Sequence, residues 1–318
     1  MQKAKTLSPG RLRAKRGSIW RDGASWELLI LCLPAIAGYI LFNYVPMGMA
    51  IMIPFRNYKF SLGVMGSDWV GLKNFEWIIR STSLWQVVRN TMLYSIWFTI
   101  IGNVVNVIFA LLMFDVKNRA ALKVYQTISS FPNFISMVVV GFITYAFLSP
   151  TAGVMNQART LLGQSAIDVY MTPSVWPAIL TIVNIWKGIG MGSMVFFAAL
   201  MGIDTSLYEA ATIDGATHLQ QIWYISLPHL VPLVSIFMIL AAGHLFSGNF
   251  DLFYLIPRNV GVLYPTTDVL PTYVYRALTA GTYSTGATVS LVQSITGLIL
   301  VIATNLFVRK ISPDNSLF

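Results

Sequence analysis

The side chains able to carry chemistry in this sequence are few and stand far apart. Its only histidines, His218, His229 and His244, lack the H-E-x-x-H or comparable spacing that holds a metal ion. No G-x-S-x-G elbow presents a nucleophilic serine, and no G-x-x-x-x-G-K-[ST] loop is present to hold the phosphates of ATP. The sequence therefore predicts a chain that is not an enzyme and that binds neither a metal ion nor a cofactor itself.

One long apolar run, residues 174–201, contains two more informative features. Lys187 lies near its middle, where a bare charge at the bilayer midplane costs several kcal/mol, so we expect it to face the bundle interior, a water-filled cavity or an acidic partner. The stretch GIGMG, residues 188–192, resembles a dinucleotide fingerprint only superficially, because it lies inside this run and lacks the required spacing. Gly188 and Gly192 instead form G-x-x-x-G, which predicts close helix packing.

The polar stretch EAATIDGATHLQQIWYISLP, residues 209–228, stands between two apolar runs and holds two acids but no lysine or arginine. Its first part favours a helix, Gly215 interrupts that helix, and LQQIW resumes it before Pro228. A plain connection between two helices takes about 2–8 residues. The much longer segment 202–226 therefore predicts a helix–glycine–helix elbow that a water-soluble partner contacts.

Membrane-spanning helices are the elements that must position these residues. The chain has 318 residues, of which 56% are hydrophobic and only 10% are charged, and its mean hydropathy is +0.66. Soluble domains usually carry about a quarter charged residues. We therefore expect an all-α polytopic membrane protein with six transmembrane helices, in the segments 28–50, 90–114, 124–149, 174–201, 227–248 and 287–308.

The distribution of positive charge predicts the orientation. Seven of the 21 basic residues lie in the first 21 positions, which is typical of a cytoplasmic end beside anionic lipid and disfavours a nucleic-acid arm. The apolar run after this tail is too long for a signal-peptide core, so we expect it to remain as the first span; it contains the only cysteine, Cys32. Both termini and the segments 115–123 and 202–226 are then cytoplasmic, whereas 51–89, 150–173 and 249–286 are outside. Within the last of these, residues 267–284 are predicted to lie near the membrane surface.

The residues EAA at 209–211, DGA at 214–216, Ile225 and LP at 227–228 resemble the EAA motif of ABC-type importer permeases. The resemblance extends over about residues 86–308, through NTMLYS, SSFPNFISMVVVGFITYAFLSPTAGVMN and TDVLPTYVYRALTAGTYSTGA. These stretches look like the oligosaccharide branch, especially the LplB-like polysaccharide or aldouronate permeases. The basic N-terminal tail has no counterpart in the resemblance.

This resemblance implies a type I importer fold, in which a cytoplasmic coupling helix meets the ATPase. It implies five kinds of partner: a second homologous permease, an ABC ATPase dimer that holds ATP and Mg, an extracytoplasmic solute-binding protein, the saccharide and membrane lipid, with no nucleic acid. The residues that would contact the ATPase are Glu209, Ala210, Ala211, Asp214 and Gly215. Because 202–226 contains no basic residue, the ATPase is expected to present a basic or mixed cleft.

The resemblance also places a substrate pathway in the span before the elbow and the span after it. The matching positions are Lys187, Gly188, Met191, His244 and Gly248, and Trp186 stands next to Lys187. For Lys187 two alternatives remain open: a structural lysine bonded to carbonyl groups or to the companion subunit, or a cationic contact for an anionic or hydroxyl-rich sugar. The same holds for Trp186, which would either stack on a sugar face or fill the core.

The resulting expectation is a permease subunit of an ATP-driven importer for oligosaccharides or polysaccharide fragments, with acidic, uronate-containing ones favoured over glycerol phosphate or small oligosaccharides. It would lie in the bacterial cytoplasmic (inner) membrane. The expected parts are a basic tail (1–26), the first transmembrane helix with its outer loop (27–85), the permease domain (86–308, with the coupling segment 202–228) and a C-terminal tail (309–318). A stand-alone secondary transporter or channel is the alternative, although no inverted repeat is detectable and no carboxylate lies within the spans. A membrane-embedded enzyme is disfavoured by the missing catalytic motifs.

Overall fold

The computed structural model describes residues 23–311, and contacts divide the chain into two compact units that meet at Met52 and Ile53. Most of the basic N-terminal tail and residues 312–318 of the C-terminal tail lie outside the described residues. The predicted cytoplasmic placement of both tails, and the lipid contact predicted for the first, therefore stay predictions.

The described part of the first unit, from Gly23 onward, consists of helix. It runs through α1 (Gly23–Tyr39), the π-helix η1 (Ile40–Tyr44) and α2 (Val45–Met52), and continues past Pro34. The stretch Leu29–Phe55 is long and apolar enough to cross a membrane, and none of its most apolar window is buried. This agrees with the first predicted span, and an apolar helix without a buried face needs lipid or another protein around it.

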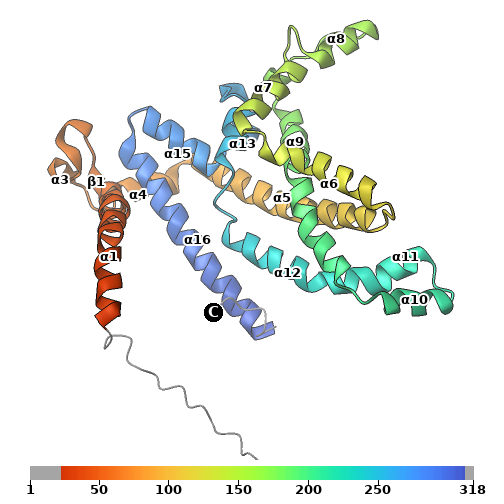
Figure 1. Cartoon of the computed structure of the whole chain (residues 1–318). Helices are drawn as coiled ribbons and strands as arrows, with labels where there is room; N and C mark the ends of the chain where they lie inside the picture. The colour runs from red at the N-terminus through yellow and green to blue at the C-terminus, as the bar shows by residue number, and fades with distance from the viewer. Residues whose placement is uncertain (1–22, 312–318) are drawn as a thin grey trace, which may run out of the picture. The chain divides into compact units, whose positions relative to one another are not determined.

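Four further stretches in the second unit are long and apolar enough to span a membrane: Thr82–Phe114, Pro173–Met201, His218–Gly243 and Tyr283–Leu306. Their main helices are α5 (Thr82–Phe114), α9 (Trp176–Met201), α12 (Leu227–Gly243) and α16 (Tyr283–Ile311). Figure 1 shows α9 running beside α5, and α12 also packs against α16. The corresponding predicted spans are confirmed, except that the helix of the fifth ends at Gly243 instead of 248.

The third predicted span, 124–149, is wrong as a single helix. The structure divides it into α6 (Arg119–Phe134) and α7 (Met137–Leu148), which meet at 97°. Pro132 cannot donate a backbone hydrogen bond, and the hydroxyl of Ser136 accepts one from the backbone N–H of Val139 and so starts a new helix. The described residues thus hold five continuous candidate spans, and up to six if the bent pair crosses the membrane as one.

The connecting segments fold into short elements. Residues 53–81 and 149–175 contain η2 (Ile53–Phe55), β1 (Arg56–Asn57), η3 (Phe60–Leu62), α3 (Gly63–Gly66), β2 (Asp68–Trp69), α4 (Lys73–Arg80), α8 (Val154–Leu161), η4 (Val169–Met171) and η5 (Pro173–Val175). Residues 202–226 contain α10 (Thr205–Ile213), α11 (His218–Gln221) and the π-helix η6 (Ile222–Ser226), and residues 249–282 contain α13 (Phe250–Leu255), η7 (Gly261–Leu263), α14 (Tyr264–Thr267) and α15 (Leu270–Thr279). The two-residue strands β1 and β2 pair antiparallel, and the remaining described structure is almost entirely helical, as expected.

Two buried clusters hold the long helices together at different levels. One contains Trp176 and Leu180 of α9 together with Leu252 of α13, and the Trp176 indole donates a hydrogen bond to the Val169 carbonyl at 3.0 Å. The other contains Phe196 and Leu200 near the end of α9, with residues of α5 and α12. The second cluster fixes the ends of the helices from which the polar elbow emerges.

Candidate functional site

The polar elbow predicted between the fourth and fifth spans is present as α10 followed by α11 (Figure 1). Asp204 begins α10 by accepting a hydrogen bond from the backbone N–H of Ser206, and this bond is the main reason that the pKa of Asp204 is lowered. Gly215 ends α10 with φ +81°, a left-handed conformation that glycine adopts without steric cost. Two backbone bonds close this turn, from Ala216 N–H to Ala211 O at 2.9 Å and from Gly215 N–H to Thr212 O at 3.1 Å, so the break predicted at Gly215 is a Schellman turn.

Hydrogen bonds between side chains tie the two arms of the elbow to each other and to the bundle. Gln221 donates to the Thr212 hydroxyl at 2.8 Å, and the hydroxyls of Tyr208 and Ser226 lie 2.9 Å apart across the base of the elbow. At the tip of α11, His218 Nε2 lies 3.0 Å from a carboxylate oxygen of Asp115, which follows α5 directly. The elbow is therefore in contact with the end of α5 as well as joined to α9 and α12.

The surface of the elbow combines acidic and apolar side chains. Glu209, Ala210, Asp214 and Gly215 are exposed, and Ala211 is half-buried. Two apolar side chains beside them are also exposed, Ile213 with 86% and Leu219 with 68% of its surface accessible. Such side chains at the tip of an otherwise hydrogen-bonded loop suit a protein partner better than water.

Lys187 does not project freely into a cavity. Its amine donates to three backbone carbonyls at the α6–α7 bend, those of Pro132 (3.3 Å), Asn133 (3.1 Å) and Ile135 (2.6 Å). The last carbonyls of a helix lack partners within the helix, and a cation there is favoured by the helix dipole. These contacts match the structural alternative for Lys187, and its contact with a sugar stays a prediction.

We expect Lys187→Met to destabilise the chain by about 1–2 kcal/mol, because it leaves these helix-end carbonyls without their cation. Thermal unfolding of the purified chain in detergent measures this change, and Lys187→Arg, which keeps the cation, should recover most of the loss. Uptake of acidic and neutral saccharides should fall to the same extent in Lys187→Met. A selective loss of acidic saccharide uptake would instead assign Lys187 to the substrate.

The glycines near Lys187 divide between two neighbouring helices. A Cβ on Gly190 would overlap the backbone of Ser129 and Ser130 in α6, and one on Gly192 would overlap the side chain of Asn106 in α5. Nothing in the described chain lies within 4 Å of a Cβ placed on Gly188. The predicted close packing is therefore confirmed at Gly192. Gly188, one helical turn from the contact with Asn106, packs against nothing in the described chain, and its packing against another helix stays a prediction.

The remaining predicted pathway residues separate into two groups. Trp186 and Met191 are 41% and 44% exposed, and Gly188 is exposed with them on α9. His244 and Gly248 instead line a cavity of about 340 Å³ between α5, the end of α12 and α13. The structure therefore does not bring the two groups together in one described cavity.

A polar stripe on α5 was missed as a functional feature by sequence reasoning. Ser95 and Thr99 line the 340 Å³ cavity, and Thr99, Asn103 and Asn106 line a neighbouring cavity of about 310 Å³ between α5, α9 and α12. The signal was present in the sequence, because Ser95, Thr99 and Asn103 recur every four residues and so share one helix face. A continuous polar face inside an apolar span suits the passage of a hydroxyl-rich solute.

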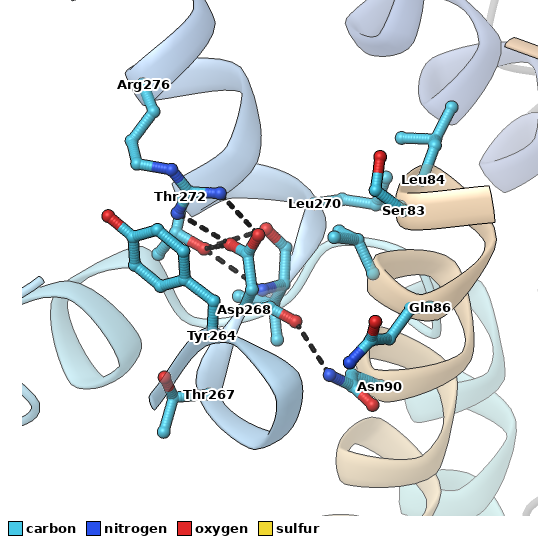
Figure 2. A network of polar contacts seen from close by, with 12 residues as sticks. Ser83, Leu84, Gln86, Asn90, Tyr264, Thr267, Asp268, Leu270, Thr272 and Arg276 are labelled. Carbon is cyan, nitrogen blue, oxygen red and sulfur yellow. Dashed lines mark hydrogen bonds and ion pairs between the residues drawn. The ribbon is translucent and has the colours of Figure 1, made fainter. Parts of the chain in front are cut away.

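A buried polar network connects the segment 264–279 to α5 (Figure 2). The Asp268 carboxylate pairs with the Arg276 guanidinium through both oxygens and accepts a hydrogen bond from the Thr272 hydroxyl at 2.7 Å. Asn90 of α5 donates to the Asp268 carbonyl at 3.2 Å, and Tyr94 donates to the Thr266 carbonyl at 2.8 Å. Residues 267–284 are thus packed onto the bundle through α15, and whether they also meet the membrane surface stays a prediction.

No group of three or more potential metal ligands occurs within residues 23–311. The cofactor expectations for this chain and for its partners stay predictions.

Comparison with known proteins gives consistent matches over nearly the whole chain. The family model described as "Binding-protein-dependent transport system inner membrane component" matches residues 102–315. The Bacillus subtilis protein LplB is 28% identical over 306 residues, which cover 95% of each chain. The polygalacturonan/rhamnogalacturonan transport system permease protein YteP of the same organism is 30% identical over 288 residues, 90% of this chain and 89% of that protein.

Solved structures agree with these sequence matches. A chain in the crystal structure of a bacterial ABC transporter involved in the import of the acidic polysaccharide alginate matches with a TM-score of 0.80 and 30% identity, covering 91% of this chain and 97% of that chain. A structure of a bacterial alginate ABC transporter in complex with alginate pentasaccharide-bound periplasmic protein matches with a TM-score of 0.78 at the same identity.

Proposed function

The chain belongs to the family of binding-protein-dependent transport system inner membrane components, and from this premise we propose that it is a permease subunit of an ATP-driven importer of acidic oligosaccharides or polysaccharide fragments. The observation that carries the proposal is the agreement with the alginate importer chain over 91% of this chain at 30% identity. The resemblance of the EAA motif to ABC importer permeases of type I fold is thereby confirmed. The chemistry of ATP hydrolysis belongs to a separate ATPase subunit that binds ATP and Mg.

The proposed substrate class is supported by the names of the relatives and by the polar face of α5. Polygalacturonan and rhamnogalacturonan appear in the name of the relative YteP, and alginate is the polysaccharide that the structural neighbour imports. In this chain, Ser95, Thr99, Asn103 and Asn106 supply hydroxyl and amide groups along α5. These groups can exchange hydrogen bonds with sugar hydroxyls without binding so tightly that the solute stays.

The proposed assembly lies in the bacterial inner membrane with both termini of this chain in the cytoplasm. A second permease would cover the exposed face of α9 that carries Trp186, Gly188 and Met191, and the pathway would run between the two subunits. A periplasmic solute-binding protein would deliver the saccharide, as the complex of the structural neighbour suggests. The elbow would dock on the ATPase through Glu209, Ala210, Ala211, Asp214 and Gly215.

The coupling role of the elbow gives a direct prediction. Glu209→Lys reverses the charge of an exposed side chain at the predicted ATPase contact, so we expect the ATPase to be lost from the complex purified from native membranes in mild detergent. Gly215→Val should have the same effect by a different route, because a β-branched residue at φ +81° strains the Schellman turn by about 1–2 kcal/mol.

Glu76→Lys on the exposed surface of α4 is the matched control, since it makes the same change on a segment predicted to lie outside. The ATPase should be recovered with the Glu76→Lys chain at the wild-type level, as identified by mass spectrometry. Equal recovery of the ATPase with the Glu209→Lys chain would contradict the assigned contact.

Transport itself tests the proposed function. The purified complex in proteoliposomes, supplied with its binding protein, should accumulate trigalacturonate only when ATP is hydrolysed. Accumulation driven by a proton or sodium gradient without ATP would support a secondary transporter, the alternative left open by the sequence.

A further inference from the structure

A small cavity on the side of the molecule predicted to be outside is lined by none of the residues proposed for the substrate pathway. It has a volume of about 190 Å³ and lies between α7, the end of α13 and the segment that follows α13. Phe142 and Tyr145 of α7, Tyr254 of α13, and Arg258 and Asn259 contribute side chains to its lining. Aromatic rings beside a cation and an amide can hold one face of a sugar together with its carboxylate.

Arg258 is held in this cavity by an unusual backbone. Arg258 and Asn259 have φ values of 57° and 52°, and they are the only described non-glycine residues with positive φ. Two consecutive left-handed residues of this kind cost energy that the surrounding structure must offset, and such residues concentrate at ligand sites. The conformation places the guanidinium 4.0 Å from the centroid of the Tyr145 ring.

The guanidinium remains available for a ligand. The Arg258 side chain is exposed and stacks on Tyr145, but the structure of residues 23–311 gives it no hydrogen-bond acceptor and no ion-pair partner. Arg276 provides a contrast, because its guanidinium is paired with Asp268. A planar guanidinium with unpaired N–H donors, fixed on an aromatic ring, is suited to a carboxylate in bidentate geometry.

The left-handed turn at Arg258 and Asn259 is contacted by Tyr264, which belongs to the polar network shown in Figure 2. The Tyr264 hydroxyl lies 3.0 Å from Asn259 Oδ1 and donates toward the Asn259 carbonyl at 3.3 Å. The Arg276 guanidinium covers the Tyr264 ring at 4.0 Å, and Asp268 holds Arg276 in place. The backbone of the turn that carries Arg258 is therefore held by partly buried contacts before any ligand arrives, which lowers the entropic cost of binding.

We propose that the cavity around Arg258 is a contact site for the carboxylate of one uronate residue, at the outer entrance to the transport path. This inference rests on the proposed function and refines it by assigning a carboxylate-selective contact to this chain. The cavity is smaller than the roughly 300–1,000 Å³ of a site for a drug-sized ligand, so it would hold part of a single sugar unit. Phe142, which is exposed, would face the sugar ring while Arg258, stacked on Tyr145, binds the carboxylate.

The test measures binding of trigalacturonate and of its neutral methyl ester to the complete complex in nanodiscs, by saturation-transfer NMR. Arg258→Asn is the informative variant, because asparagine tolerates a left-handed backbone, so the change removes the guanidinium without straining the turn. We expect trigalacturonate to bind this variant roughly tenfold more weakly, as loss of a charged hydrogen-bond donor predicts, while binding of the methyl ester changes little. Arg80→Asn, a change at an exposed arginine at the end of α4, should leave both unchanged.

Uptake of trigalacturonate and ATP hydrolysis are followed in the same preparations, so that failure of the importer function is seen separately. Unchanged binding of trigalacturonate to Arg258→Asn, or equal losses for the acid and its ester, would overturn the carboxylate contact while leaving the importer intact. Absence of binding to the wild-type complex would overturn it as well. Loss of co-purified phospholipid in Arg258→Asn, with saccharide binding unchanged, would assign the cavity to a lipid headgroup instead.

Discussion

Gly190→Ala is expected to prevent stable packing of α9 against α6, with a loss of about 3 kcal/mol or more. The methyl group would overlap the backbone of Ser129 and Ser130, so no change of side-chain rotamer can accommodate it. The two helices must then separate along their contact, and the carbonyls that Lys187 holds at the end of α6 would move with them. A large fall in the thermal unfolding temperature of the purified chain, together with faster proteolysis, measures the effect.

Two changes on the same helix serve as controls. Gly188→Ala meets no atom of the described chain within 4 Å, and alanine favours a helix over glycine by about 1 kcal/mol, so the chain should keep or gain stability. Gly192→Ala overlaps only the side chain of Asn106, so the added change Asn106→Ala should restore part of its loss. Equal effects of Gly188→Ala and Gly190→Ala would show that the α6–α9 contact does not limit stability.

The difference between these glycines shows where sequence reasoning on the fold succeeds and fails. Length and apolarity are local properties, and they were enough to locate the long helices, because each span must satisfy its own backbone hydrogen bonds. The α6–α7 bend was missed because apolar residues continue on both sides of it, although Pro132 and Ser136 mark the break. Which of three glycines meets α6 depends on how the helices are rotated, and no local pattern encodes that rotation.

The elbow was predictable because its break depends on local sequence, whereas its contacts with distant residues were not predictable. A helix-breaking Gly215 in a polar stretch indicates two arms, and the observed Schellman turn needs only residues close in sequence. The contact between His218 and Asp115 joins residues 103 positions apart, so it follows from the bundle and not from the elbow. Likewise, nothing in the local sequence distinguishes the exposed guanidinium of Arg258 from the paired one of Arg276.

Removal of one partner from the Asp268–Arg276 pair is the second change with a large expected effect. The Asp268 side chain is only 7% exposed and that of Arg276 is 22% exposed. Burial lowers the pKa of Arg276, but the hydrogen bond and charge of Asp268 outweigh it, so that the pKa is raised overall. Arg276→Met leaves a buried carboxylate without its cation, and loss of one partner from a buried pair costs about 3–5 kcal/mol.

A double-mutant cycle separates the pair from the side chains that form it. Asp268→Asn combined with Arg276→Met leaves no unpaired charge, so the double variant should unfold at a higher temperature than Arg276→Met alone. If the stability losses of the two single variants simply added in the double variant, the ion pair would contribute little, and the contacts of Asn90 and Tyr94 would be the main attachment of the segment 264–279 to α5. Asn90→Ala tests that route, because it removes a donor to two carbonyls of this segment, Pro265 and Asp268, and leaves the ion pair in place.

The ion pair also bears on the Arg258 site, because Arg276 covers Tyr264, which holds the Arg258 turn. Arg276→Met should therefore weaken trigalacturonate binding more than Asn90→Ala does at equal loss of stability.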